Sequence, residues 1–168
     1  MIPSVFGGKV QCHCKCTLCI EEEDKMRTRN ILWPTDFSDT SSHALKYAIE
    51  MANLYQVGIR ILHVVDQPFG DENHMILAIT PEELAKSMEE VASSRMHELL
   101  EQLNTKLQIE TVIRRGDAIA EILAEANSGD IGMVVIASHG RSGIAHFLND
   151  NVAEAIVNKA ECPVLVVK

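Results

Sequence analysis

The first residues that could do chemistry are four thiols near the start of the chain. Cys12, Cys14, Cys16 and Cys19 lie close together with His13 among them, whereas the remaining sequence holds a single cysteine. Four thiolates satisfy the tetrahedral coordination of a structural zinc ion, although zinc folds usually use two separated Cys-x-x-Cys pairs. Only Cys16 and Cys19 have that spacing. Three alternatives therefore remain: a metal site with zinc as the candidate ion, redox-reactive thiols, and an unstructured tail.

Two further groups of small and polar residues follow short apolar runs at residues 31–33 and 131–137. The groups are Pro34, Thr35 and Asp36, and His139, Gly140, Arg141, Ser142 and Gly143. If the two apolar runs are neighbouring parallel strands, both groups lie at the carboxyl edge of one sheet, where open α/β sheets bind their ligands. His139 has no nucleophile or orienting carboxylate that the sequence identifies, which favours a structural loop residue over a catalytic base.

The elements that position these groups begin near residue 30, where a polar, cysteine-rich stretch gives way to regular hydrophobic blocks. We interpret residues 1–29 as an extension and residues 30–168 as one domain. Hydrophobic periodicity predicts strands at residues 31–33, 57–65, 107–113, 131–137 and 164–167. It predicts helices at residues 38–56, 80–103, 117–126 and 152–160. Alternating strands and helices indicate an open, doubly wound parallel sheet.

Two local patterns support these assignments. Apolar side chains occupy both faces of the predicted strand at residues 57–65, as expected of a parallel strand covered by helices on both sides. Thr80, Pro81 and Glu83 combine an N-cap, a proline in the first turn and a capping-box glutamate.

Four fragments at residues 34–38, 138–143, 151–154 and 162–167 together resemble the universal stress protein family over residues 30–168. The resemblance implies a three-layer, flavodoxin/HUP-like α/β fold. Its five-stranded parallel sheet has the order 3-2-1-4-5 and is flanked by four helices. The resemblance also implies a homodimer and, in one branch of the family, ATP bound at the carboxyl edge of the sheet. The residues that it places at an adenine-nucleotide site are Pro34, Thr35, Asp36, Val64, Ala137, His139, Gly140, Arg141, Ser142, Gly143, Asp150, Asn151 and Val152.

The phosphate-binding segment departs from the family pattern, which places glycine, glycine, glycine and a serine or threonine at positions 137, 140, 150 and 151. This chain has Ala137, Gly140, Asp150 and Asn151 there, so only Gly140 matches. A carboxylate at the start of the last helix would occupy the anion site that free helix amides create. Two unit charges about 4 Å apart repel by about 4 kcal/mol at an effective dielectric of about 20, which lowers triphosphate affinity about a thousandfold. The alternative is that Asp150 or a neighbouring asparagine is an ordinary N-cap.

The adenosine half of the site is better preserved. By resemblance, Pro34, Thr35 and Asp36 line one side and Val64 presents backbone to adenine. Asp36 either accepts a hydrogen bond from the nucleotide or serves as a turn residue, because aspartate readily accepts hydrogen bonds from amides two positions on. We therefore expect a less charged adenine nucleotide such as AMP in preference to ATP.

Charge and composition limit the remaining possibilities. A net charge of −9 argues against nucleic acid and anionic membranes as partners. The sequence has no long apolar span and no export signal at its start, which predicts a cytoplasmic protein. A phosphate-loop lysine and an acidic pair for magnesium are both missing, so we expect no enzyme, with weak ATP hydrolysis left open. The apolar strand Val164–Val167 predicts pairing with a second copy of the chain, with Val164 and Val166 or their neighbours buried there.

The sequence thus predicts a homodimeric, stress-response binding or signalling module with a degenerate adenine-nucleotide pocket. The first alternative is a switch that binds ATP or AMP and hydrolyses ATP at most slowly. The second is a metal or redox sensor that uses the N-terminal cysteine cluster.

Overall fold

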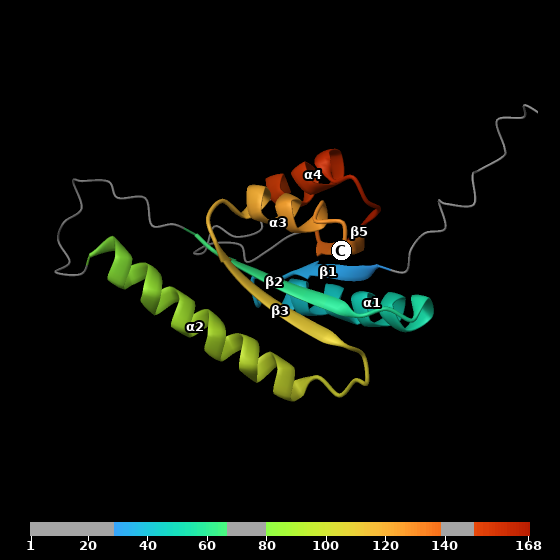
Figure 1. Cartoon of the computed structure of the whole chain (residues 1–168), viewed down its shortest axis with the longest axis horizontal. Helices are drawn as coiled ribbons and strands as arrows, with labels where there is room; N and C mark the ends of the chain where they lie inside the picture. The colour runs from blue at the N-terminus through green and yellow to red at the C-terminus, as the bar shows by residue number, and fades with distance from the viewer. Residues whose placement is uncertain (1–28, 67–79, 139–149) are drawn as a thin grey trace, which may run out of the picture.

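Five parallel strands form the centre of the protein (Figure 1). The computed structural model describes residues 29–66, 80–138 and 150–168. Its strands are β1 (Asn30–Pro34), β2 (Ile59–Val65), β3 (Ile109–Arg115), β4 (Ile131–Ala137) and β5 (Val164–Val167). They are ordered β3-β2-β1-β4-β5, which confirms the predicted sheet.

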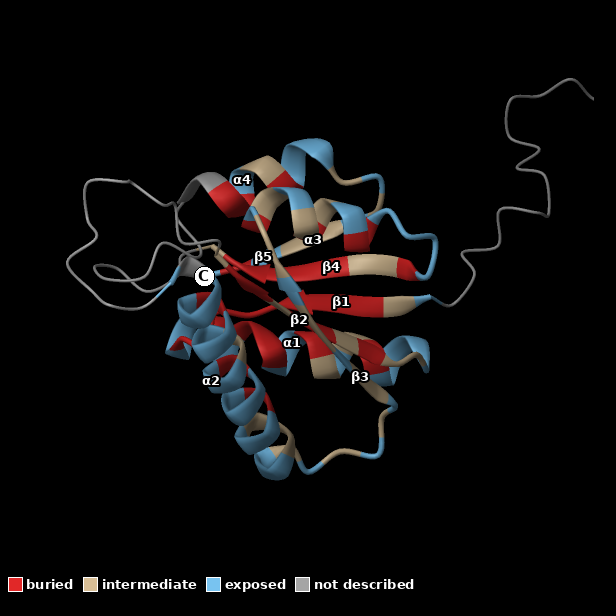
Figure 2. Ribbon diagram, turned by 60° about the vertical axis from the view of Figure 1, so that its left-hand side comes forward, coloured by how far each residue is buried: buried red, intermediate tan, exposed pale blue. Residues whose placement is uncertain are grey.

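Two layers of helices cover the sheet. The helices are α1 (Asp39–Tyr55), α2 (Pro81–Gln102), α3 (Ala118–Ala126) and α4 (Asp150–Lys159). Figure 2 shows α1 and α2 on one face and α3 and α4 on the other. The three-layer arrangement with four helices follows the sequence-based prediction.

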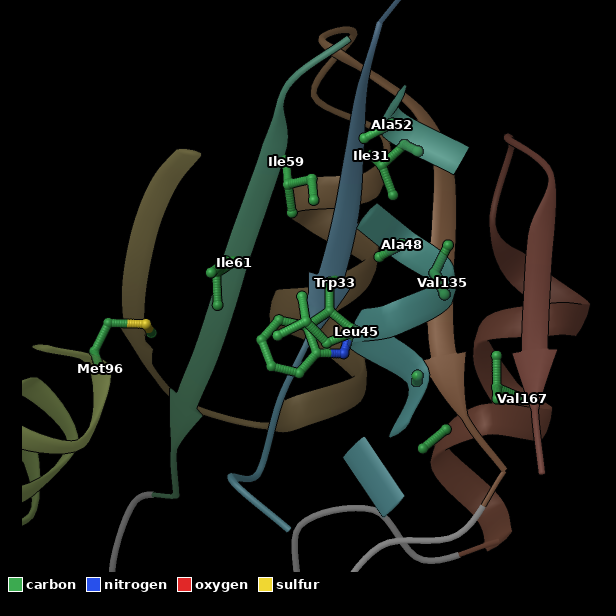
Figure 3. Close-up of a cluster of buried hydrophobic side chains, with 12 residues drawn as sticks. Ile31, Trp33, Leu45, Ala48, Ala52, Ile59, Ile61, Met96, Val135 and Val167 are labelled. Carbon is green, nitrogen blue, oxygen red and sulfur yellow. The ribbon is translucent and has the colours of Figure 1, made fainter. Parts of the chain in front are cut away.

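A separate hydrophobic cluster fills the space on each face. On the α1 and α2 face, Trp33 and Ile61 of the sheet lie with Leu45 of α1 and Met96 of α2 (Figure 3). On the opposite face the strand residues include Leu62 and Val64, and the helix residues include Ile122 and Ile156. Adjacent residues of β2 therefore serve opposite clusters, which confirms that both faces of this strand are covered.

Side-chain caps fix the starts of three helices. Ser38 accepts a hydrogen bond from the Ser41 amide at the start of α1. Thr80 and Glu83 form the predicted capping box at the start of α2. Asp117 accepts a hydrogen bond from the Ala120 amide at the start of α3, at a distance of 2.8 Å. Each cap satisfies an amide that lacks a partner within its helix.

Element boundaries differ from the sequence-based expectation by one or two residues, and β2 begins at Ile59, two residues after the predicted start. β3 begins and ends two residues later than predicted, because it pairs with β2 from the register pair Ile59 and Ile109 to the pair Val65 and Arg115. α4 begins at Asp150, two residues before the predicted start, and ends at Lys159.

An ionic network that the sequence did not reveal ties β2, β3 and α3 together. Arg60 lies 2.8 Å from Glu110 and 2.8 Å from Glu125, and Arg114 lies 3.0 Å from Glu125. Glu125 is only 6% exposed. Its two arginine partners neutralise a carboxylate that would otherwise be buried at considerable cost.

Candidate functional site

The sheet has its topological switch point between β1 and β4. These strands are neighbours, but the helix that follows β1 packs on one face and the helix that follows β4 packs on the other (Figure 2). In open α/β sheets the crevice that holds a ligand lies at this point, beyond the carboxyl ends of the strands, which here are β1 and β4. The loop at residues 35–38 and the end of β4 lie at this edge.

The loop between β1 and α1 is held by its own side chains. Thr35 is 4% exposed and Asp36 is 7% exposed. Asp36 Oδ1 accepts hydrogen bonds from the amide and the hydroxyl of Ser38. Thr35 Oγ1 lies 2.6 Å from Ser41 Oγ and accepts a hydrogen bond from the Phe37 amide. The turn role that the sequence allowed for Asp36 is thus present, and it fixes where the carboxylate lies.

His63 supports the same loop from the neighbouring strand. Its Nδ1 lies 2.8 Å from the Thr35 carbonyl oxygen, so this nitrogen carries the proton and donates. The His63 ring also packs on Phe37, with centroids 4.5 Å apart. Burial lowers the pKa of His63, and the hydrogen bond to Thr35 opposes that shift. His63 thus lies within the strand predicted at residues 57–65 and is hydrogen-bonded to the neighbouring loop.

Phe37 was not identified from the sequence. It has a positive φ of 59°, which is uncommon for a residue with a side chain. Its amide donates to Thr35 and its ring contacts His63, so the surrounding contacts hold this conformation. No sequence pattern marks a left-handed phenylalanine, because asparagine and glycine are the residues that usually adopt it.

Val64 directs backbone groups toward the crevice. Backbone groups alternate in direction along a strand, and the carbonyls of Gly58 and Leu62 accept hydrogen bonds from Ile31 and Thr35 on the β1 side. The backbone groups of Val64 point to the same side as those of Gly58 and Leu62. Val64 lies beyond the last register pair between the two strands, Pro34 with Leu62. Its amide and carbonyl therefore point past the end of β1, its side chain packs in the core, and the residue as a whole is 2% exposed.

The β4 side of the crevice is described only in part. Ala137 is buried, and the Ser138 amide donates to the Val167 carbonyl at 2.7 Å, which carries the sheet to the end of β4. Val152 packs its side chain in the core, so only its backbone can contact a ligand. The predicted site residues that lie outside the described residues are His139, Gly140, Arg141, Ser142 and Gly143. α4 starts at Asp150, but the side chains of Asp150 and Asn151 also lie outside the description.

The predicted cysteine cluster, Cys12, Cys14, Cys16 and Cys19, lies outside the described residues as well. Within residues 29–66, 80–138 and 150–168, no three His, Cys, Asp or Glu side chains are grouped so that they could hold a metal ion. Cys162 is partly buried there, and burial raises the pKa of its thiol. The same ranges contain no helix that is both long enough and apolar enough to cross a membrane.

The sheet order β3-β2-β1-β4-β5 and the helices on both faces define a doubly wound α/β domain. The universal stress protein family matches residues 27–168, and the chain belongs to this family. Universal stress protein MJ0577 of Methanocaldococcus jannaschii is 28% identical over 153 residues, which are 83% of this chain and 94% of the relative. Universal stress protein MJ0531 of the same organism is 30% identical over 145 residues, with 83% and 82% covered.

Solved structures share the fold. Universal stress protein UspA from Lactobacillus plantarum has a TM-score of 0.70 at 23% identity, covering 84% of this chain and 99% of its own. Two further universal stress proteins, each with a TM-score of 0.53, were solved with an adenine nucleotide. One is in complex with cAMP, at 18% identity with 83% and 97% of the two chains covered. The other, from Archaeoglobus fulgidus, is in complex with dAMP, at 22% identity with 83% and 98% covered.

Proposed function

We propose that the protein is a homodimeric stress-response binding module that holds an adenine nucleotide with one phosphate, without catalytic turnover. The observation that carries this proposal is the switch point at the carboxyl ends of β1 and β4, bordered by the loop at residues 35–38 and by the backbone of Val64, which points past the end of β1. In this proposal the nucleotide lies beyond the ends of β1 and β4, with AMP bound more tightly than ATP.

The β1 side of the crevice suits an adenosine. The amide and carbonyl of Val64 point past the end of β1, where they can donate to and accept from an adenine edge. Asp36 is fixed by Ser38, so its carboxylate is pre-organised for a ribose hydroxyl. The family members in complex with cAMP and dAMP hold ligands with a single phosphate, which supports the same choice here.

The phosphate side of the proposed site favours a nucleotide with few negative charges. The first residue of α4 is Asp150, and the first turn of a helix is where free amides would otherwise attract phosphate. An acid at this position competes for those amides and repels further negative charge. One phosphate experiences less of this repulsion than three, so we expect AMP to outcompete ATP.

Calorimetric titration of the protein with AMP and with ATP tests the proposal. We expect AMP to bind more tightly than ATP in the parent protein. In the double variant Asp150→Gly with Asn151→Ser, ATP affinity should rise by at least about tenfold, because repulsion and backbone obstruction are both removed. Glu154→Gln is the control, since it removes an exposed charge from the same helix. Equal ATP affinity in the double variant and its parent would contradict the proposal that Asp150 and Asn151 weaken ATP binding.

Strand β5 supplies the proposed contact between subunits. It lies at one edge of the sheet and pairs on its other side with β4. Val166 is 38% exposed although it is a large apolar side chain. An unprotected apolar edge favours pairing with the same strand of a second copy, which a two-fold axis would close into a dimer.

A further inference from the structure

One peptide group in the loop between β1 and α1 is held from the neighbouring strand β2. The carbonyl oxygen of Thr35 lies 2.8 Å from Nδ1 of His63, which donates to it. The same peptide group contains the amide of Asp36, and a peptide group is planar. The hydrogen bond from His63 therefore fixes the orientation of the peptide between Thr35 and Asp36, and with it the direction in which the chain enters Asp36.

Phe37 turns the chain directly after Asp36. Its φ of 59° lies in the left-handed region, which is unfavourable for a residue with a Cβ atom. After this turn, the amide and the hydroxyl of Ser38 both donate to Asp36 Oδ1. The Phe37 ring packs on the ring of His63, with centroids 4.5 Å apart. An unfavourable backbone conformation persists only where its surroundings hold it, and such positions cluster at ligand sites.

His63 also belongs to the other border of the proposed nucleotide site. It immediately precedes Val64, whose backbone amide and carbonyl point past the end of β1. One strand residue thus connects the backbone proposed to face adenine with the loop proposed to face the ribose. Asp36 is held from both of its neighbours in the chain, by His63 through the preceding peptide and by Phe37 through the following turn.

We propose that His63 and Phe37 are positioning residues that determine how strongly the ribose hydroxyls of the nucleotide are recognised. Both act through Asp36, because the strength of a hydrogen bond from a hydroxyl to a carboxylate depends on its length and direction. This inference rests on the proposed binding of an adenine nucleotide at the switch point. It adds a hydrogen-bond donor on β2 and a left-handed residue after Asp36 to the determinants of that binding.

Calorimetric titration of the full-length protein with AMP and with dideoxy-AMP isolates the ribose hydroxyls, because the two ligands differ only there. We expect the parent protein to bind AMP at least about tenfold more tightly, since a hydroxyl that donates to a carboxylate is lost in the analogue. A variant that is merely less stable lowers both affinities equally. A variant that displaces the Asp36 carboxylate lowers the ratio of the two affinities.

Two pairs of variants separate the contacts. His63→Asn keeps a nitrogen donor near the position of Nδ1, whereas His63→Phe keeps an aromatic ring beside Phe37 and loses the donor. Phe37→Asn adopts the left-handed backbone readily, whereas Phe37→Val resists it, and both lack the ring. We expect the two asparagine variants to keep the affinity ratio within about twofold of the parent, and the other two to reduce it below about threefold.

Thr80→Ala is the control for lost stability, because it removes the cap of α2 without changing a contact of the loop. Its affinity ratio should equal that of the parent. The two pairs are independent, so either one decides the question if a variant of the other does not fold. An unchanged ratio in His63→Phe and Phe37→Val, or equal binding of AMP and dideoxy-AMP by the parent, would overturn this inference and leave the proposed function intact. No saturable AMP binding by the parent up to about 10 mM would overturn both.

Discussion

At the residue scale, His63 connects the sheet to the loop that borders the switch-point crevice. It donates from Nδ1 to the Thr35 carbonyl and packs on Phe37, so its position and its protonation are linked to the same loop. The sequence identified His63 as a strand residue, because the pattern of apolar residues that marks β2 can be seen in neighbouring positions of the chain. It did not identify the contact with Thr35, because 28 residues separate the two positions in the chain.

The lowered pKa of His63 predicts how stability depends on pH. Below the ordinary histidine pKa of about 6.5, the unfolded chain binds a proton that the folded protein still excludes. The contribution of His63 to stability is therefore fully present above about pH 6.5, and it is lost as the pH falls toward the lowered folded-state pKa. His63→Asn should reduce the loss of stability between about pH 7.5 and pH 5.5, measured by urea unfolding.

His97 offers a control for this experiment, because it is exposed on α2 beside Glu101. His97→Asn controls for the loss of an imidazole at another, exposed position of the protein. If His63→Asn and the parent lose the same free energy of unfolding over that pH interval, His63 is not the group responsible.

A second prediction at this scale concerns the buried carboxylate of Glu125. Glu125→Gln removes the charge that pairs with Arg60 and Arg114 but keeps the size of the side chain. We expect the free energy of unfolding to fall by about 1.5 to 3 kcal/mol, the range for hydrogen bonds to charged groups. Arg60 retains Glu110, which limits the loss. Urea unfolding measures the change, and Glu154→Gln on an exposed face should change stability by less than about 0.5 kcal/mol. Equal losses in the two variants would show that the network does not stabilise the fold.

At the element scale, the sequence predicted each helix and strand of the described residues in the correct order, because each has a local signal. The alternation of strands and helices indicated a parallel sheet. The order of the strands within that sheet came from the family resemblance. β3 begins and ends two residues later than predicted, because its limits are set by pairing with β2, which is a long-range interaction.

The capping box of α2 gives the prediction at this scale. Thr80→Ala removes the hydroxyl that accepts from the Glu83 amide and leaves that amide without its cap. We expect a loss of about 0.5 to 2 kcal/mol in the free energy of unfolding, measured with urea. Ser87→Ala in the exposed middle of the same helix should be neutral or slightly stabilising, because alanine is the better helix former. A neutral Thr80→Ala variant would show that this cap does not contribute to stability.

At the scale of the whole molecule, the two edges of the sheet are not equivalent. The edge strand β3 carries charged residues, including Arg114 and Arg115, and α2 lies beside it. The edge strand β5 is apolar throughout its four residues. Charged side chains protect an edge from pairing, so the proposed dimer should form through β5 and leave β3 unpaired.

Proline substitutions on the two edge strands test whether the dimer forms through β5 or through β3. In β5 the carbonyls of Pro163 and Val167 accept from β4, so the alternating amide of Val166 points away from the sheet. Val166→Pro removes an outward amide without breaking the ladder to β4, and it should convert the dimer to a monomer in sedimentation velocity experiments. Thr111→Pro is the matched control on β3, where the Thr111 amide also points outward by the same alternation. A dimer that survives Val166→Pro but is lost with Thr111→Pro would show that the subunits pair through β3 and not through β5.

Native mass spectrometry with AMP and ATP present at equal concentrations tests the proposed function most directly, because one spectrum reports subunit number, bound nucleotide and any retained metal. We expect a dimer that carries AMP in preference to ATP. A bound metal would identify the cysteine cluster at residues 12–19 as a further site and leave the nucleotide result unaffected. A dimer that carries mainly ATP would show that Asp150 does not limit phosphate binding, and a monomer would contradict the proposed pairing through β5.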